Sequence, residues 1–75
     1  MNRFTIAVLV RNQSGVLNRV TSMFRRRRFN IICLTVSETE SAAYSRITVN
    51  AEGEDTAKKQ LIDQLYKLPD VCSIK

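Results

Sequence analysis

The chain has 75 residues, 44% of them apolar, so its composition fits one small globular domain rather than a disordered segment. It has no histidine and only two cysteines without CxxC spacing, which excludes Ser–His and Cys–His catalysis and argues against structural zinc. No apolar run reaches the ~20 residues of a membrane helix, and no signal-peptide cleavage site follows MNRFTIAVLV, so we expect a cytoplasmic protein without membrane contact.

The net charge of +5 is distributed unevenly along the chain. Residues 1–37 contain seven arginines and no acid, whereas residues 38–75 contain five basic and seven acidic residues. Nucleic-acid-binding modules often have such a basic half. The run Arg25–Arg28 also fits the solvated end of a helix, where cations oppose the helix dipole, or a contact with an acidic partner protein.

The first part of the chain predicts a strand, a turn and a helix. Residues 3–10 alternate, with apolar residues on both faces, which indicates a central strand. The turn NQSG follows, and Asn12 or Ser14 is expected to cap a helix from Gly15 to about Arg27. Apolar side chains then recur at the helical period on one face of that helix, at Val16, Leu17, Val20, Met23 and Phe24.

The remaining residues predict a hairpin, a second helix and a short strand. Residues 30–37 (NIICLTVS) and 43–51 (AYSRITVNA) are rich in β-branched residues and are joined by a polar connection. A turn is expected at 52–55 around Gly53, and a helix at 56–68 with Ala57, Leu61, Leu65 and Leu68 inward. Pro69 ends this helix, and residues 71–75 form the last strand.

The resulting order β-α-β-β-α-β predicts a ferredoxin-like α+β fold, with sheet order 4-1-3-2 and both helices on one face. Cys33 and Cys72 then lie on opposite edge strands, roughly 14 Å apart by strand spacing, which is too far for a disulfide. We therefore expect free thiols that act as small apolar fillers.

This fold serves several functions, so particular residues must separate them. The central strands offer only Phe4 and Tyr44 for base stacking, fewer than an RNA-recognition module needs. A metal carrier needs a CxxC in the first loop, which here reads NQSG. Arg19 and Asn30 do not have the spacing of an acylphosphatase-like phosphate cradle.

Five segments in order resemble the ACT domain of acetohydroxyacid (acetolactate) synthase regulatory subunits. They are NQSGVLNRVTSMF, RRRRFNI, LTVSETE, SRITV and QLIDQLYKLPDV. The resemblance implies a single ACT domain over residues 1–75 that binds valine or a related amino acid at the interface of a homodimer. It also implies feedback control and activation of a separate catalytic subunit that uses thiamine diphosphate, so this chain itself would be non-catalytic and without a cofactor. An ACT domain of another biosynthetic enzyme, which senses a different amino acid, is an alternative.

The sequence departs from the family pattern at two places. Arg28 stands where glycine is common, and a left-handed position would cost it about 1–2 kcal/mol, so the helix exit is expected to become an ordinary turn. Ile32 and Cys33 replace a usual polar pair. Many relatives carry a second domain, so these 75 residues are either a short form or a fragment.

The turn NQSG has the chemistry of a carboxylate site. The N–H groups of Gly15, Val16 and Leu17 lack intrahelical acceptors, and Asn12 adds a side-chain amide. The side-chain carbonyl of Asn30 could accept a hydrogen bond from the ligand's ammonium, but Asn30 lies roughly 18 Å from Gly15 along the helix. One ligand can therefore contact both residues only across a two-fold dimer that is joined along this helix and the strand 30–37. The candidate effector-binding residues are Asn12, Ser14, Gly15, Val16, Leu17, Asn30 and Ile31; capping alone is the simpler alternative.

Overall fold

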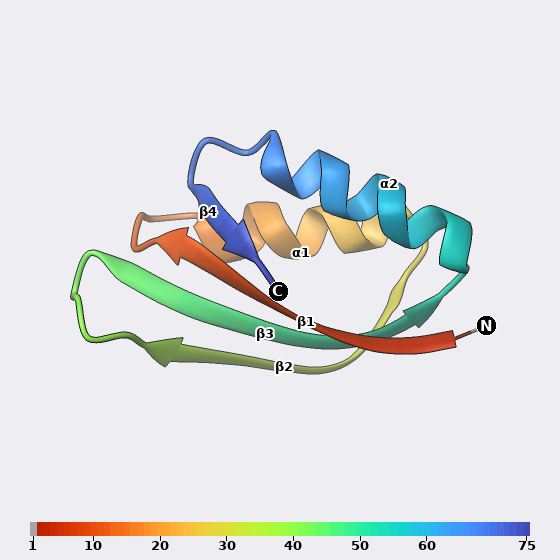
Figure 1. The fold of residues 1–75 in the computed structure, drawn as a ribbon, viewed down its shortest axis with the longest axis horizontal. Coiled ribbons are helices and arrows are strands. Elements are labelled where there is room, and N and C mark those ends of the chain that lie inside the picture. Colours follow the sequence, from red (N-terminus) through yellow and green to blue (C-terminus); the bar gives the residue numbers. More distant parts are fainter. Residues whose placement is uncertain (1) are drawn as a thin grey trace.

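Six elements follow one another in the predicted order β-α-β-β-α-β. The computed structural model describes residues 2–75 and contains β1 (Asn2–Arg11), α1 (Val16–Arg26), β2 (Asn30–Glu38), β3 (Tyr44–Gly53), α2 (Asp55–Tyr66) and β4 (Val71–Ile74). The four strands form one antiparallel sheet in the order β2-β3-β1-β4, which confirms the predicted topology. Both helices lie on the same face of the sheet (Figure 1).

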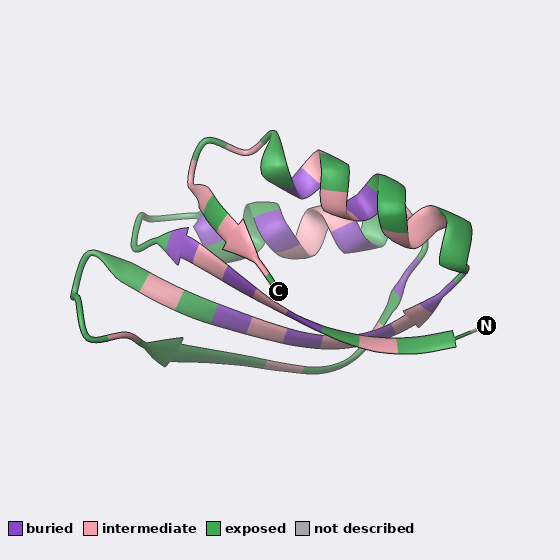
Figure 2. Ribbon diagram, in the orientation of Figure 1, coloured by how far each residue is buried: buried purple, intermediate pink, exposed green. Residues whose placement is uncertain are grey.

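The core lies between the helices and the covered face of the sheet (Figure 2). Its members are buried apolar side chains at helical spacing on α1 and α2 and at alternate positions on β1 and β3. They are Val16, Val20 and Phe24 of α1, Leu61 and Leu65 of α2, Ile6, Val8 and Val10 of β1, and Ile47, Val49 and Ala51 of β3, with Phe29 beyond the end of α1. The strand order puts β2 and β4 at the edges of the sheet, so within residues 2–75 one side of β2 has no neighbouring strand.

The strand β3 is longer than predicted, because Gly53 ends this strand instead of belonging to a turn. Gly53 pairs with Asn2 and is buried. A Cβ at this position would lie 2.3 Å from Cδ1 of Phe29, so only glycine leaves room for that ring. Phe29 in turn makes edge-to-face contacts with Phe4 and Phe24, at centroid distances of 5.4 and 6.2 Å. The glycine therefore marks close packing.

The exit from α1 is a Schellman motif, and the expected ordinary turn is wrong. The N–H of Phe29 donates to the carbonyl of Phe24, and the N–H of Arg28 donates to the carbonyl of Arg25. Arg28 takes the left-handed position of this motif, with φ 63°. The apolar contact between Phe24 and Phe29 accompanies it, so core packing holds a non-glycine residue in a conformation that costs about 1–2 kcal/mol.

The two cysteines are free, as predicted, but they are not core fillers. Cys33 on β2 and Cys72 on β4 are both exposed. Each belongs to an edge strand and is left outside the core between the sheet and the helices. Alternation along a strand does not by itself reveal which face the helices cover.

Candidate functional site

The turn between β1 and α1 brings backbone N–H groups to the surface. Gly15 is the N-cap residue of α1 in a left-handed conformation, with φ 83° and ψ −4°. No side chain caps the helix, so the predicted capping by Asn12 or Ser14 is wrong. Residues 12–15 are all exposed. Glycine is needed here because a left-handed N-cap disfavours residues with a Cβ.

Several amide groups in the first turn of α1 are free to bind a ligand. The N–H of Val16 donates to the carbonyl of Gln13 at 3.3 Å, a long hydrogen bond. Within residues 2–75, no acceptor faces the N–H groups of Gly15, Leu17 and Asn18. The first turn also contains no acidic residue. An anion at this end of the helix would therefore meet unpaired donors and the positive end of the helix dipole.

Asn12 fixes the shape of this turn. Its Nδ2 donates to the carbonyl of Ala42 at 3.2 Å, and its backbone N–H donates to the carbonyl of Ala43 at 2.8 Å. Both contacts join the turn to the connection between β2 and β3. The side-chain amide of Asn12, which was predicted to bind the ligand, thus holds the turn in place instead.

A hollow of about 70 Å³ adjoins the first turn of α1, but neither Ser14 nor Gly15 lines it. Its lining includes Asn12, Val16 and Leu17 from the predicted set, and also Val36 of β2, which the sequence did not single out. Small-molecule pockets commonly have roughly 300–1,000 Å³. One chain therefore supplies only part of a binding site at this position.

A larger hollow of about 630 Å³ lies at the β2–β3 connection, near Tyr44 and Arg46. Glu38 and Glu40 also line it. It offers one arginine beside two carboxylates and none of the free amides of α1, so it suits a carboxylate ligand less well than the helix end does.

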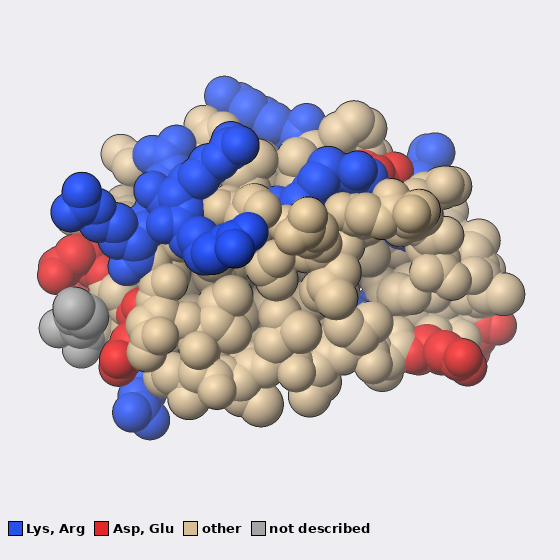
Figure 3. All heavy atoms as spheres, turned by 180° about the vertical axis from the view of Figure 1, so that it is seen from behind, with Lys and Arg blue, Asp and Glu red and all other residues tan. Residues whose placement is uncertain are grey.

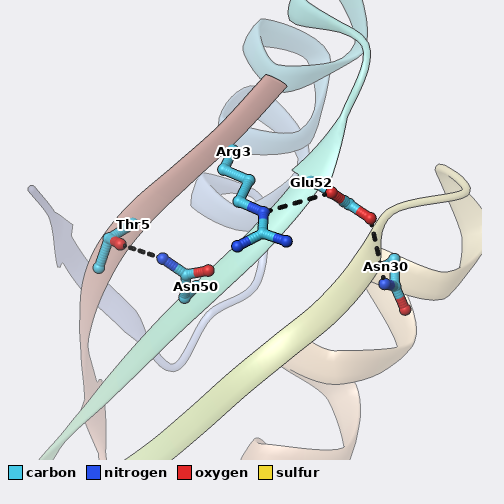
Figure 4. Close-up of polar contacts among 5 residues, drawn as sticks. All are labelled: Arg3, Thr5, Asn30, Asn50 and Glu52. Atoms are coloured by element: carbon cyan, nitrogen blue, oxygen red, sulfur yellow. Dashed lines mark hydrogen bonds and ion pairs between the residues drawn. The ribbon is translucent and has the colours of Figure 1, made fainter. Parts of the chain in front are cut away.

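Asn30 and Ile31 lie at the other end of α1, where β2 begins (Figure 1). The 11 residues of α1, at about 1.5 Å each, separate them from Gly15 by roughly 16 Å. Nδ2 of Asn30 donates to Glu52 at 3.4 Å, and Glu52 also pairs with Arg3 at 3.4 Å (Figure 4). The carbonyl oxygen of Asn30 points away from Glu52 (Figure 4). A single chain therefore does not bring the two halves of the predicted site together.

Apolar side chains are exposed between these two places. Leu17 on α1 is 41% exposed, and Ile32 and Val36 on β2 are 41% and 50% exposed. Periodicity predicted an inward Leu17, but it lies at the edge of the helix face, beside Val36. Ile32 sits at a register shift between β2 and β3. The unpaired edge of β2 and the adjoining side of α1 therefore form an apolar surface.

Basic side chains gather at the end of the molecule where α1 ends, and acidic side chains lie both at that end and at the opposite end (Figure 3). Arg25, Arg26 and Arg28 are exposed. Among residues 2–75, no group of His, Cys, Asp or Glu is arranged to hold a metal ion. Neither helix of this described part of the chain is long and apolar enough to cross a membrane.

Residues 6–73 match the family described as the AHAS small subunit-like ACT domain. The probable acetolactate synthase small subunit of Archaeoglobus fulgidus is 50% identical over 72 residues, which are 96% of this chain and 45% of that protein. The isozyme 3 small subunit of Escherichia coli is 39% identical over 96% of this chain and 44% of its own length. This chain thus spans less than half the length of these relatives.

Solved structures agree with this comparison. The acetolactate synthase small subunit of Thermotoga maritima superposes on all of this chain with a TM-score of 0.87 at 35% identity, over 47% of that chain. The ACT domain of the GTP pyrophosphokinase of Chlorobium tepidum has a TM-score of 0.81 at 16% identity, which shows the fold alone.

Proposed function

Because this chain belongs to the AHAS small subunit-like ACT domain family, we propose that it is the effector-binding domain of an acetolactate synthase regulatory subunit. It performs no chemistry itself and needs no cofactor. It binds valine or a related amino acid and so controls a separate catalytic subunit that uses thiamine diphosphate. The observation that carries the proposal is the start of α1 in a chain of this family, where free amides follow Gly15 and an apolar hollow adjoins the first helical turn.

The ligand's carboxylate binds at the start of α1. The N–H groups of Gly15 and Leu17 point their positive ends at it, and Gly15 lets it approach the backbone closely. Ser14 lies next to the same turn and adds a hydroxyl. Val16 and Leu17 of one copy and Ile31 of the other bound the aliphatic side chain, and this apolar surround would favour branched apolar amino acids.

The ligand's ammonium binds to the carbonyl oxygen of Asn30 in a second copy of the chain. Asn30 and Gly15 of one chain lie at opposite ends of α1, so both act on one ligand only in a two-fold dimer with antiparallel α1 helices. The two β2 edges then join in one eight-stranded sheet. This arrangement covers Leu17, Ile32 and Val36, which are exposed in the single chain, and it removes an open strand edge.

Calorimetry separates this function from binding of nucleic acid through the arginine run. The chain is titrated with valine, leucine and isoleucine, and in parallel with a fluorescent single-stranded oligonucleotide. Saturable heat from a branched-chain amino acid, together with co-purification of a catalytic subunit, supports the proposal. Oligonucleotide binding that weakens steeply with salt, without amino-acid heat, would refute it in favour of the nucleic-acid module.

A further inference from the structure

The arginine run Arg25–Arg28 at the end of α1 forms no ion pair with any of residues 2–75. Residues 2–75 contain two ion pairs, Arg3–Glu52 and Arg19–Asp70, and neither involves this run. Arg25 contacts the hydroxyl of Ser22, and Arg27 contacts the amide oxygen of Gln60 at 3.2 Å. The side-chain contacts of the run among residues 2–75 are therefore with neutral groups, and none is an ion pair.

Arg28 is the member of the run nearest to β2. It is exposed and holds a left-handed conformation that glycine would adopt without strain. It lies two residues before Asn30, the first residue of β2. The helix exit accounts for its conformation, and its exposure leaves the side chain accessible to a contact outside the chain.

Two acidic residues lie at the other end of the same strand, near Arg46 but without an ion pair to it. Glu38 is the last residue of β2, and Glu40 follows two residues later. Both are exposed, and neither forms an ion pair with any of residues 2–75. Arg28 thus places a positive charge just before the start of β2. Glu38 and Glu40 place two negative charges at its end and just after it.

We propose that Arg28 of one copy pairs with Glu40 of the second copy, in two symmetric ion pairs that set the register of the dimer. The inference rests on the dimer of the proposed function. In an antiparallel β2–β2 contact centred on Leu34, the middle residue of the strand, the start of β2 in one copy lies beside the end of β2 in the other. Arg28, just before that start, then comes near the second copy's Glu40, just after that end. A shifted register would leave these charges unmatched.

Sedimentation velocity of the 75-residue chain over a range of concentrations and NaCl tests the pairing. Arg28→Glu keeps a charged residue at the same strained position but makes both pairs repulsive, so the dimer Kd should rise about tenfold at low salt. Glu40→Arg should have a similar effect. The double variant R28E/E40R restores attraction, and its Kd should return to within about threefold of the native value.

Two further variants separate pairing from folding. Arg28→Gly suits the left-handed position, so the fold should melt at a higher temperature while the dimer weakens by about threefold. Arg26→Ala removes a charge from the same run on the side of α1 that faces Leu68, and should leave the Kd unchanged.

The outcomes distinguish this pairing from the dimer itself. If the native chain dimerises and neither R28E nor E40R changes the dimer Kd, the pairing is overturned and the proposed dimer stands. The same holds if the double variant dimerises as weakly as the two single changes combined would predict. A native chain that stays monomeric overturns the dimer and the pairing together. Loss of oligonucleotide binding in R28E, with an unchanged dimer, would assign the run to nucleic acid and also overturn the pairing.

Discussion

Replacing Gly15 by aspartate is expected to abolish amino-acid binding while leaving the chain folded. The new carboxylate would lie at the start of α1, beside the amides that are proposed to hold the ligand's own carboxylate. Gly15 has φ 83°, and a Cβ there would meet only the end of the Arg19 side chain, at 3.2 Å. That side chain can move, so the cost to the fold is the left-handed conformation, about 1 kcal/mol, partly offset by an acidic group at a helix N-terminus.

The effect on binding follows from the repulsion between two carboxylates at one donor site. At a separation of about 4 Å and an effective dielectric constant near 20, like charges repel by about 4 kcal/mol. Each 1.4 kcal/mol is a factor of about ten in affinity, so the Kd should rise by roughly a thousandfold. Arg19 reduces this effect only in part, because it already pairs with Asp70 at 2.6 Å.

Gly15→Asn is the matched control for this change. Asparagine has nearly the same shape as aspartate, tolerates the left-handed region comparably and carries no charge. Calorimetry with valine, leucine and isoleucine gives the affinities of the native chain and both variants, and circular dichroism with thermal melts checks the fold. We expect both variants to stay folded, with the aspartate variant melting slightly higher because of its charge at the helix N-terminus, and much weaker binding in the aspartate variant alone.

Two results would refute this reasoning. If Gly15→Asp binds a branched-chain amino acid as tightly as the native chain, the turn only begins a helix and holds no carboxylate. If Gly15→Asn loses as much affinity as Gly15→Asp, then shape at the turn, and not charge, controls binding.

Three further predictions concern the second half of the site, the dimer and the core. Asn30→Ala should weaken amino-acid binding by about 1.5–3 kcal/mol in the same calorimetric assay, because it removes an acceptor for the ammonium; an unchanged Kd would mean that the ammonium binds elsewhere. Val36→Lys puts a charge on the apolar surface beside Leu17, so sedimentation should show a folded monomer; a persisting dimer would place the interface on another face. Gly53→Ala should lower the free energy of unfolding by about 1–3 kcal/mol in urea denaturation, since its Cβ overlaps the ring of Phe29; an unchanged midpoint would show that the ring moves aside at little cost.

The sequence by itself determined the order of the elements, the sheet topology and the family. Alternation along residues 3–10 and helical spacing from Val16 to Phe24 are local patterns, and each depends only on the geometry of its own element. Handedness rules and short connections then leave few ways to arrange four strands and two helices. The free amides near Gly15 also follow from the sequence, because every helix begins with unpaired N–H groups.

Only the tertiary structure decided which of these groups are accessible and how the connections are built. Asn12 and Ser14 have the right chemistry for caps, but the contact of Asn12 with Ala42 and the left-handed Gly15 replace the cap. Gly53 belongs to β3 because the ring of Phe29 occupies the space of a side chain. Packing of that ring against Phe24 also holds Arg28 in its left-handed position. These features depend on neighbours distant in sequence, whose positions are set by the packed core and not by any local period.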